Sequence, residues 1–125
     1  MNPPTTKTLG DAAEARALAH LEAAGLVLVR RNYRVARGPS SRGGEVDLVM
    51  RERDGTLVFV EVRCRSDDRF GGAASTVGSA KRRRLVFAAT HYLRRLPIPP
   101  PHRFDVVAVD GDRIEWQRAG FDAGD

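Results

Sequence analysis

The sequence contains very little cysteine and lysine, and it has no long apolar run. Its single cysteine, Cys64, excludes an internal disulfide and any metal cluster built from cysteines. No apolar stretch approaches the roughly 20 residues that span a bilayer, so we expect no membrane partner. The first residues, MNPPTTKTLGDAAE, lack the apolar core of a secretory signal, which predicts a cytoplasmic protein.

The scarcity of lysine means that arginine carries most of the positive charge. Lys7 and Lys81 are the two lysines among 21 Lys and Arg residues, against 16 Asp and Glu, and the formal net charge is +5. This balance favours a polyanionic partner, nucleic acid above all, although it also fits a ribosome-associated or simply a basic soluble protein.

The length of 125 residues and the hydrophobic fraction of 42% indicate one domain, residues 1–125, with loose tails at 1–7 and 119–125. We expect helices at 11–24 and 79–95 and strands at 26–34, 45–50, 57–64, 104–109 and 113–117. A helix between two strands makes a crossover, which usually gives parallel pairing. The predicted fold class is therefore α/β, with a mixed central sheet flanked by helices.

Carboxylates interrupt the two apolar runs of the central hairpin: Asp47 lies in the first run and Glu61 in the second. A buried carboxylate is costly unless a cation or hydrogen bonds compensate it. A two-residue turn at Asp54 and Gly55 would place the two carboxylates on opposite faces. A three-residue loop, with Gly55 in the left-handed region, places Asp47 directly opposite Glu61, and we predict this loop.

Strict alternation along the strands assigns the remaining side chains to faces. It places Glu45, Asp47 and Val49 on one face of the first strand of the hairpin. In the second strand it places Arg63 on the face of Glu61 and predicts that Cys64 is a buried, inert thiol. On the first helix, Glu14 falls on or beside the buried stripe, where it is either a solvated glutamate or a site residue.

Directly opposed carboxylates are roughly 5 Å apart at Cβ, so one divalent cation could bridge them. Asp47, Glu61 and the carbonyl of Val62 are the oxygen ligands that Mg²⁺ or Mn²⁺ accepts. Such a cation activates water and neutralises charge on a phosphodiester. Without a metal, Glu61 could instead pair with Arg63, and Asp47 with an arginine of the preceding strand.

Four cations open the second predicted helix: Lys81, Arg82, Arg83 and Arg84. Positive charge near a helix N-terminus opposes the helix dipole, so local stability does not explain these residues. Contact with phosphate explains them, and a solvated basic face is the alternative.

The pattern Glu45-Val46-Asp47, a turn, then Val60-Glu61-Val62-Arg63 resembles the PD-(D/E)XK signature of restriction endonucleases and Holliday junction resolvases. More closely, the chain resembles the YraN family of uncharacterised bacterial proteins over most of its length. The stretches that carry this resemblance are Gly10 with Glu14, Arg31-Asn32-Tyr33-Arg34, Gly44-Glu45-Val46-Asp47-Leu48, Phe59-Val60-Glu61-Val62-Arg63-Cys64-Arg65, Lys81 with Leu85, Ala89 and Tyr92-Leu93, and Arg103-Phe104-Asp105-Val106-Val107.

The resemblance implies a restriction-endonuclease-like fold, metal ligation by Asp47 and Glu61, and Glu14 as a third acid. The sequence departs from the signature at one position, where Arg63 replaces the lysine. Arginine keeps the charge but cannot shuttle a proton, because its pKa stays above ~12. Either the lysine's role is electrostatic, or the site has lost activity, or Lys81 supplies the lysine from the neighbouring helix.

Two functions follow as expectations. The first is a Mg²⁺- or Mn²⁺-dependent endonuclease acting on DNA, for which branched or damaged DNA is a candidate substrate, with Asp47, Glu61, Arg63 and Glu14 as the catalytic residues. The second is an inactive nucleic-acid-binding module of the same fold. In both, phosphates would contact Arg65, Lys81, Arg82, Arg83 and Arg84. A homodimer would suit cleavage of both strands, although no feature of the sequence specifies one.

Overall fold

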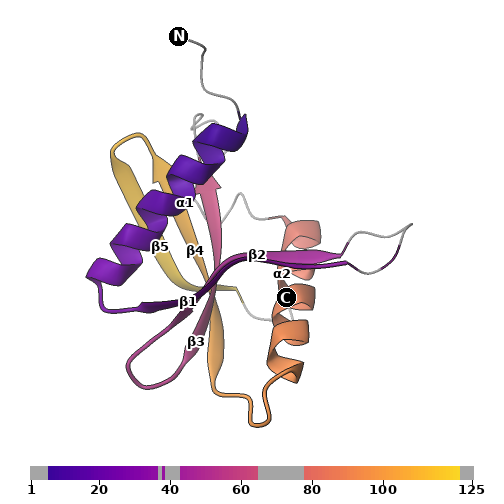
Figure 1. Ribbon diagram of the computed structural model, residues 1–125. Coiled ribbons are helices and arrows are strands. Elements are labelled where there is room, and N and C mark those ends of the chain that lie inside the picture. Colours follow the sequence, from indigo (N-terminus) through magenta and orange to yellow (C-terminus); the bar gives the residue numbers. More distant parts are fainter. Residues whose placement is uncertain (1–5, 37, 39–42, 65–77, 122–125) are drawn as a thin grey trace.

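The computed structural model describes residues 6–36, 38, 43–64 and 78–121 (Figure 1). Two helices and five strands follow one another along the chain. They are α1 (Thr6–Ala23), β1 (Val27–Val35), β2 (Gly44–Arg51), β3 (Leu57–Cys64), α2 (Ser79–Arg94), β4 (His102–Asp110) and β5 (Arg113–Phe121). Neither described helix is long and apolar enough to cross a membrane.

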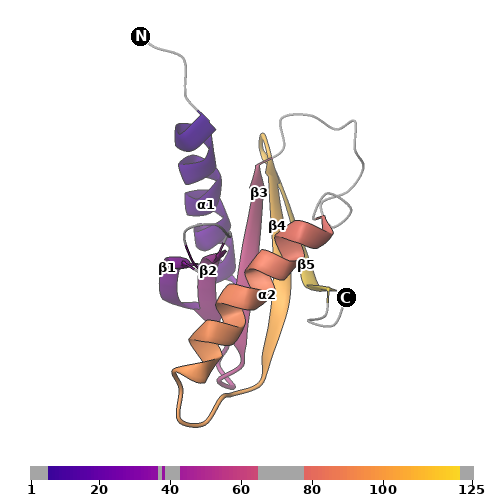
Figure 2. The same cartoon turned by 90° about the vertical axis from the view of Figure 1, so that its right-hand side faces the viewer.

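The five strands form one sheet in the order β1-β2-β3-β4-β5. Strands β3 and β4 are parallel, as expected for a crossover through α2, and the other neighbours are antiparallel. Figure 2 shows α1 and α2 on opposite sides of the sheet. The predicted α/β class with a mixed central sheet is therefore confirmed.

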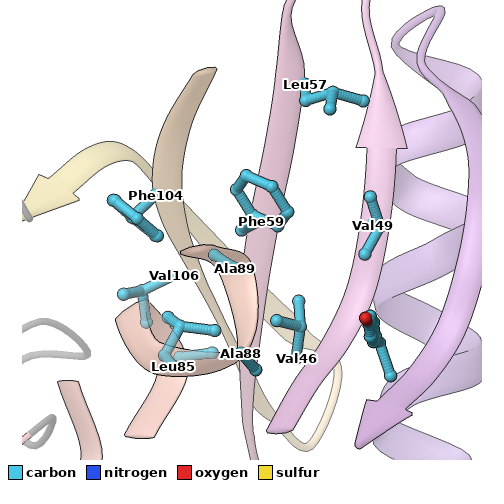
Figure 3. Packing of buried hydrophobic residues seen from close by; sticks show 11 residues of the cluster. Val46, Val49, Leu57, Phe59, Leu85, Ala88, Ala89, Phe104 and Val106 are labelled. Atoms are coloured by element: carbon cyan, nitrogen blue, oxygen red, sulfur yellow. The ribbon is translucent and has the colours of Figure 1, made fainter. Parts of the chain in front are cut away.

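Each face of the sheet packs its own apolar cluster. Leu85, Ala88 and Ala89 of α2 cover Phe59 of β3, and Figure 3 shows Val46 among these side chains. On the other face, Ala13, Ala17 and Leu21 of α1 belong to a cluster with Leu48, Met50, Val58, Val60 and Val107. The small alanines of α1 bring its backbone close to the sheet, so the helix places Glu14 near the strands.

Glycine allows an equally close approach on the α2 side. A Cβ atom at Gly44 would collide with the backbone carbonyl of Arg84 and lie 2.9 Å from the backbone nitrogen of Ala88. The first residue of β2 therefore lies directly against α2, which fixes the N-terminal half of that helix beside the carboxylates of β2.

The β2–β3 hairpin has the predicted loop. Glu52 and Thr56 are joined by a backbone hydrogen bond of 2.9 Å, and the N–H of Gly55 donates to the carbonyl of Glu52 at 3.0 Å. Gly55 has φ +93°, in the left-handed region. The paired residues run from Arg51 opposite Leu57 to Leu48 opposite Val60, and the next pair in this register is Asp47 with Glu61.

Strand β2 changes direction at Asp47. Its pairing with β3 ends at Leu48, whereas its pairing with β1 continues to Gly44. Asn32, which faces Asp47 across the β1–β2 ladder, has φ +52°. Because the chain bends here, Val46 and Val49 pack in the same apolar cluster. Strict alternation, which puts Val46 and Val49 on opposite faces, was therefore wrong for this strand.

Other sequence expectations also need correction. Helix α1 begins at Thr6 and β5 ends at Phe121, so both elements extend into the segments predicted to be loose tails. Strand β1 lies at the edge of the sheet, where its apolar start is exposed (Val27 52%, Val29 38%) and Tyr33 is buried. Residues 1–5 and 122–125 lie outside the described part of the chain.

Candidate carboxylate site

A cavity of about 220 Å³ opens where β2 leaves β3, between the two helices. Four carboxylates and two cations line it. The lining residues are Gly10, Ala13, Glu14, Glu45, Asp47, Glu61, Val62, Cys64, Lys81 and Arg84. They come from α1, β2, β3 and α2, so the cavity exists because these four elements meet at one edge of the core.

Asp47 takes the place of a backbone partner for β3. Its Oδ2 accepts a hydrogen bond of 2.8 Å from the backbone N–H of Val62, at the point where the ladder between β2 and β3 has ended. Burial, the nearby charge of Glu61 and a hydrogen bond with Glu61 raise the pKa of Asp47 to about 8, against the lowering effect of the Val62 bond. Without a cation, Asp47 therefore tends to keep its proton near neutral pH.

Glu61 is one of two buried carboxylates in the described chain, with 4% of its surface exposed. Its Oε1 lies 2.7 Å from Nζ of Lys81, in the first turn of α2. A buried carboxylate needs such compensation. The sequence suggested Arg63 as the alternative partner of Glu61, but in the structure Glu61 pairs with Lys81.

Glu14 and Glu45 form the outer part of the carboxylate set. Burial raises the pKa of Glu14, and the charges of Arg31 and Arg34 on β1 oppose that rise. Nε of Arg34 lies 3.4 Å from Oε2 of Glu45, but the arginine side chain is 71% exposed, so this pair is weak. Glu14 is therefore a cavity residue rather than a solvated glutamate.

The structure brings together Asp47, Glu61, Glu14 and Lys81 but not every predicted site residue. Arg63 is half-buried on β3 and is absent from the described cavity lining. Along the basic turn of α2, Lys81 and Arg84 reach the cavity, Arg83 is exposed and Arg82 is half-buried. Arg65 lies outside the described residues.

Sequence reasoning missed two cavity residues. Strict alternation placed Glu45 on the face of Asp47, but Glu45 was given no role in the site, whereas its side chain lines the cavity. Cys64 is exposed and lines the cavity, so the prediction of a buried thiol was wrong. It is the last residue of β3, and the apolar cover that buries the middle of that strand does not extend over it.

The donor set fits a divalent cation. Asp47 and Glu61 supply carboxylate oxygens, and a hard cation readily replaces the proton that the raised pKa of Asp47 retains. Within the described residues, no three acidic, histidine or cysteine side chains are gathered as a complete ligand set. Water and a carbonyl such as that of Val62 would have to complete the coordination shell.

Comparisons with known proteins identify relatives over nearly the whole chain. The model of the family described as "Uncharacterised protein family UPF0102" matches residues 13–109. A UPF0102 protein of Paracidovorax citrulli is 62% identical over 120 residues, covering 96% of this chain and 87% of the relative. A UPF0102 protein of Methylibium petroleiphilum is 64% identical over 119 residues, covering 95% and 98%.

Proposed function

This chain belongs to the uncharacterised protein family UPF0102, and from the chemistry of its carboxylate cavity we propose that it is a divalent-metal-dependent endonuclease acting on DNA. The observation that carries the proposal is the buried pair of Asp47 and Glu61 beside Lys81. The resemblance of the central hairpin to the PD-(D/E)XK nuclease signature supports the same function. A cytoplasmic location is a further proposal, based on the sequence, and a homodimer is proposed because it would suit cleavage of both strands.

In this proposal Asp47 and Glu61 hold Mg²⁺ or Mn²⁺ through their carboxylate oxygens, and the carbonyl of Val62 adds a third ligand. The bound cation would supply an activated water and charge neutralisation at the phosphodiester. Glu14, on the opposite helix, orients water in the outer shell. The N–H of Val62 keeps Asp47 in place by a hydrogen bond of 2.8 Å.

Lys81 takes the role that the signature gives to its lysine. Its ammonium group reaches the carboxylate pair from α2, whereas Arg63 does not line the cavity. A lysine here can bind a phosphate oxygen and can also give or take a proton, which arginine cannot do. The replacement of the signature lysine by Arg63 is then no obstacle to catalysis.

A second candidate function is a nucleic-acid-binding module without catalysis. The ion pair between Lys81 and Glu61 favours it, because the ammonium group already neutralises a carboxylate that the metal would need. Binding by such a module would weaken steeply with salt and would survive chelation of divalent ions.

Two measurements separate these functions. The first is calorimetric titration of the protein with Mn²⁺, comparing wild type with Asp47→Asn. The second is incubation with Mg²⁺ or Mn²⁺ and linear, flapped and four-way-junction DNAs, using Glu61→Gln as the control. The nuclease proposal expects metal binding and cleavage by wild type alone. Equal cleavage by wild type and Glu61→Gln, or none by either, removes the enzyme and leaves the binding module.

A further inference from the structure

A second group of basic side chains surrounds Tyr33, away from the carboxylates. The ring of Tyr33 is 3% exposed and belongs to the core under α2. Its hydroxyl lies 2.6 Å from Nδ1 of His91 and accepts a hydrogen bond of 3.5 Å from Nη1 of Arg95. The guanidinium groups of Arg30 and Arg95 lie 5.2 and 5.9 Å from the ring centroid. We call these four residues the Tyr33 cluster.

The basic members of the cluster have no acidic partner among the described residues. By contrast, Arg34 pairs with Glu45, Lys81 with Glu61, and Arg103 with Glu52 and Asp105. Arg30, His91 and Arg95 are all exposed. Two guanidinium groups and an imidazole gathered around one buried ring offer several donors to an anion.

The Tyr33 cluster and the cavity lie at opposite ends of α2. Lys81 and Arg84, in the first turns of α2, line the cavity, whereas Arg95 caps the other end of that helix. Fourteen residues separate Lys81 from Arg95, which corresponds to about 21 Å along a helix axis. One DNA strand advances about 3.4 Å per base pair, so this separation spans about six base pairs.

We propose that the Tyr33 cluster binds a backbone phosphate of duplex DNA about six base pairs from the phosphate that enters the cavity. The proposal rests on the proposed function, because the same DNA must occupy both places. It adds a minimum substrate length and a binding site on β1 and the C-terminal end of α2. A small phosphorylated ligand would need only one of the two cationic groups, whereas a duplex contacts both.

The test compares two charge-matched double variants by fluorescence anisotropy on a series of duplex lengths in Ca²⁺. Arg30→Gln/Arg95→Gln removes the guanidinium groups of the cluster. Arg51→Gln/Arg113→Gln removes two exposed arginines elsewhere and is the control. Thermal melts establish that both proteins fold. For duplexes of about 20 base pairs we expect the cluster variant to bind about tenfold more weakly, with a salt slope less steep by about one, because one phosphate contact is lost.

Duplexes shorter than about six base pairs cannot join the cavity to the cluster. On these, the cluster variant should lose less affinity than on long duplexes, because one short duplex cannot occupy both places at once. Tyr33→Phe, which keeps the ring and removes the hydroxyl that holds Arg95 and His91, should give a smaller loss on long duplexes only.

Three outcomes would overturn the inference. Equal losses in both double variants would mean that general electrostatics accounts for the binding, while the proposed function would stand. Binding of phosphatidylglycerol vesicles that the cluster variant alone loses, with DNA binding unchanged, would assign the cluster to a lipid surface. Absence of DNA binding by wild type at low salt would remove both the inference and the proposed function.

Discussion

The ammonium nitrogen of Lys81 lies 2.7 Å from Oε1 of Glu61, so α2 delivers a cation to a carboxylate that β3 buries. The pair joins the two elements at the edge of the cavity. Since Lys81 is 43% exposed and Glu61 only 5% exposed at their side chains, removing the lysine should cost more than an ordinary surface pair.

Lys81 therefore has a structural and a chemical role that substitution can separate. Lys81→Ala leaves Glu61 buried without its cation, and we expect a loss of about 1–3 kcal/mol in the free energy of unfolding, measured in urea at pH 7. Lys81→Arg keeps the charge, so it should cost less than about 1 kcal/mol, yet slow DNA cleavage by at least about a hundredfold if the lysine transfers a proton. Cleavage by Lys81→Arg at the wild-type rate would restrict the lysine to an electrostatic role.

The raised pKa of Asp47 makes the stability of the metal-free protein depend on pH. The pKa is about 8 in the folded chain and 3.8 for the unperturbed group, so the folded state holds the proton more tightly. Asp47 thus stabilises the fold below pH ~4, and this contribution is lost as the pH rises from about 4 to about 8. We expect thermal melting in EDTA to show this decline.

Asp47→Asn is the matched variant, because the amide oxygen can still accept the hydrogen bond from Val62. It should flatten the pH profile and raise the free energy of unfolding by about 2 kcal/mol at pH 8. It should also abolish Mn²⁺ binding. A variant less stable than wild type at pH 8 would contradict the protonation of Asp47.

The sequence was sufficient to predict the hairpin because local chemistry determined its register. Asp54 and Gly55 specify the turn, and the turn sets the register that pairs Leu48 with Val60 and ends beside Asp47 and Glu61. The crossover rule likewise predicted the parallel pairing of β3 and β4. In these cases each conclusion depended on residues close together in the chain or on a general rule of topology.

The features of the fold and the site that were not predicted depend on tertiary contacts, which no local sequence pattern encodes. Strand β1 places its apolar start at the sheet edge and buries Tyr33, because α2 covers the far half of that strand. The pairing of Glu61 with Lys81 joins residues 20 positions apart and requires the position of α2. The sequence pattern predicts Asn32 as an ordinary strand residue, although asparagine is depleted in strands and enriched among residues with positive φ.

Asp105 lies on β4 and is not among the described residues that line the cavity. Its substitution therefore tests the stability of the fold separately from the site. It is fully buried and accepts hydrogen bonds from Nε of Arg103 at 3.0 and 3.2 Å, from Nε1 of Trp116 at 2.9 Å and from the N–H of Ala119 at 2.9 Å. Arg103 in turn binds Glu52 at 2.8 Å. Asp105→Ala would leave the donors unpaired, and we expect a loss of about 3–5 kcal/mol.

In the fraction of Asp105→Ala that remains folded, the affinity of the cavity for Mn²⁺ should be unchanged. Glu52→Gln is the milder control, because it weakens one partly exposed ion pair and should cost less than about 1 kcal/mol. Urea denaturation measures both effects, and calorimetry measures Mn²⁺ affinity. Loss of metal binding in folded Asp105→Ala would show that the network also positions the site.

Asn32 lies on β1 beside the place where β2 leaves β3, so we expect its backbone conformation to affect the position of Asp47. Its φ of +52° is tolerated by asparagine and glycine but not by a β-branched residue. Asn32→Val should therefore lower the free energy of unfolding by about 1–2 kcal/mol, and Asn32→Gly should change it by less than about 1 kcal/mol. Because Asp47 faces Asn32 across the ladder, the valine variant should also shift the carboxylate and weaken Mn²⁺ binding severalfold, whereas the glycine variant should bind as wild type does. Unchanged metal affinity in folded Asn32→Val would show that the bond from Val62 alone is enough to hold Asp47.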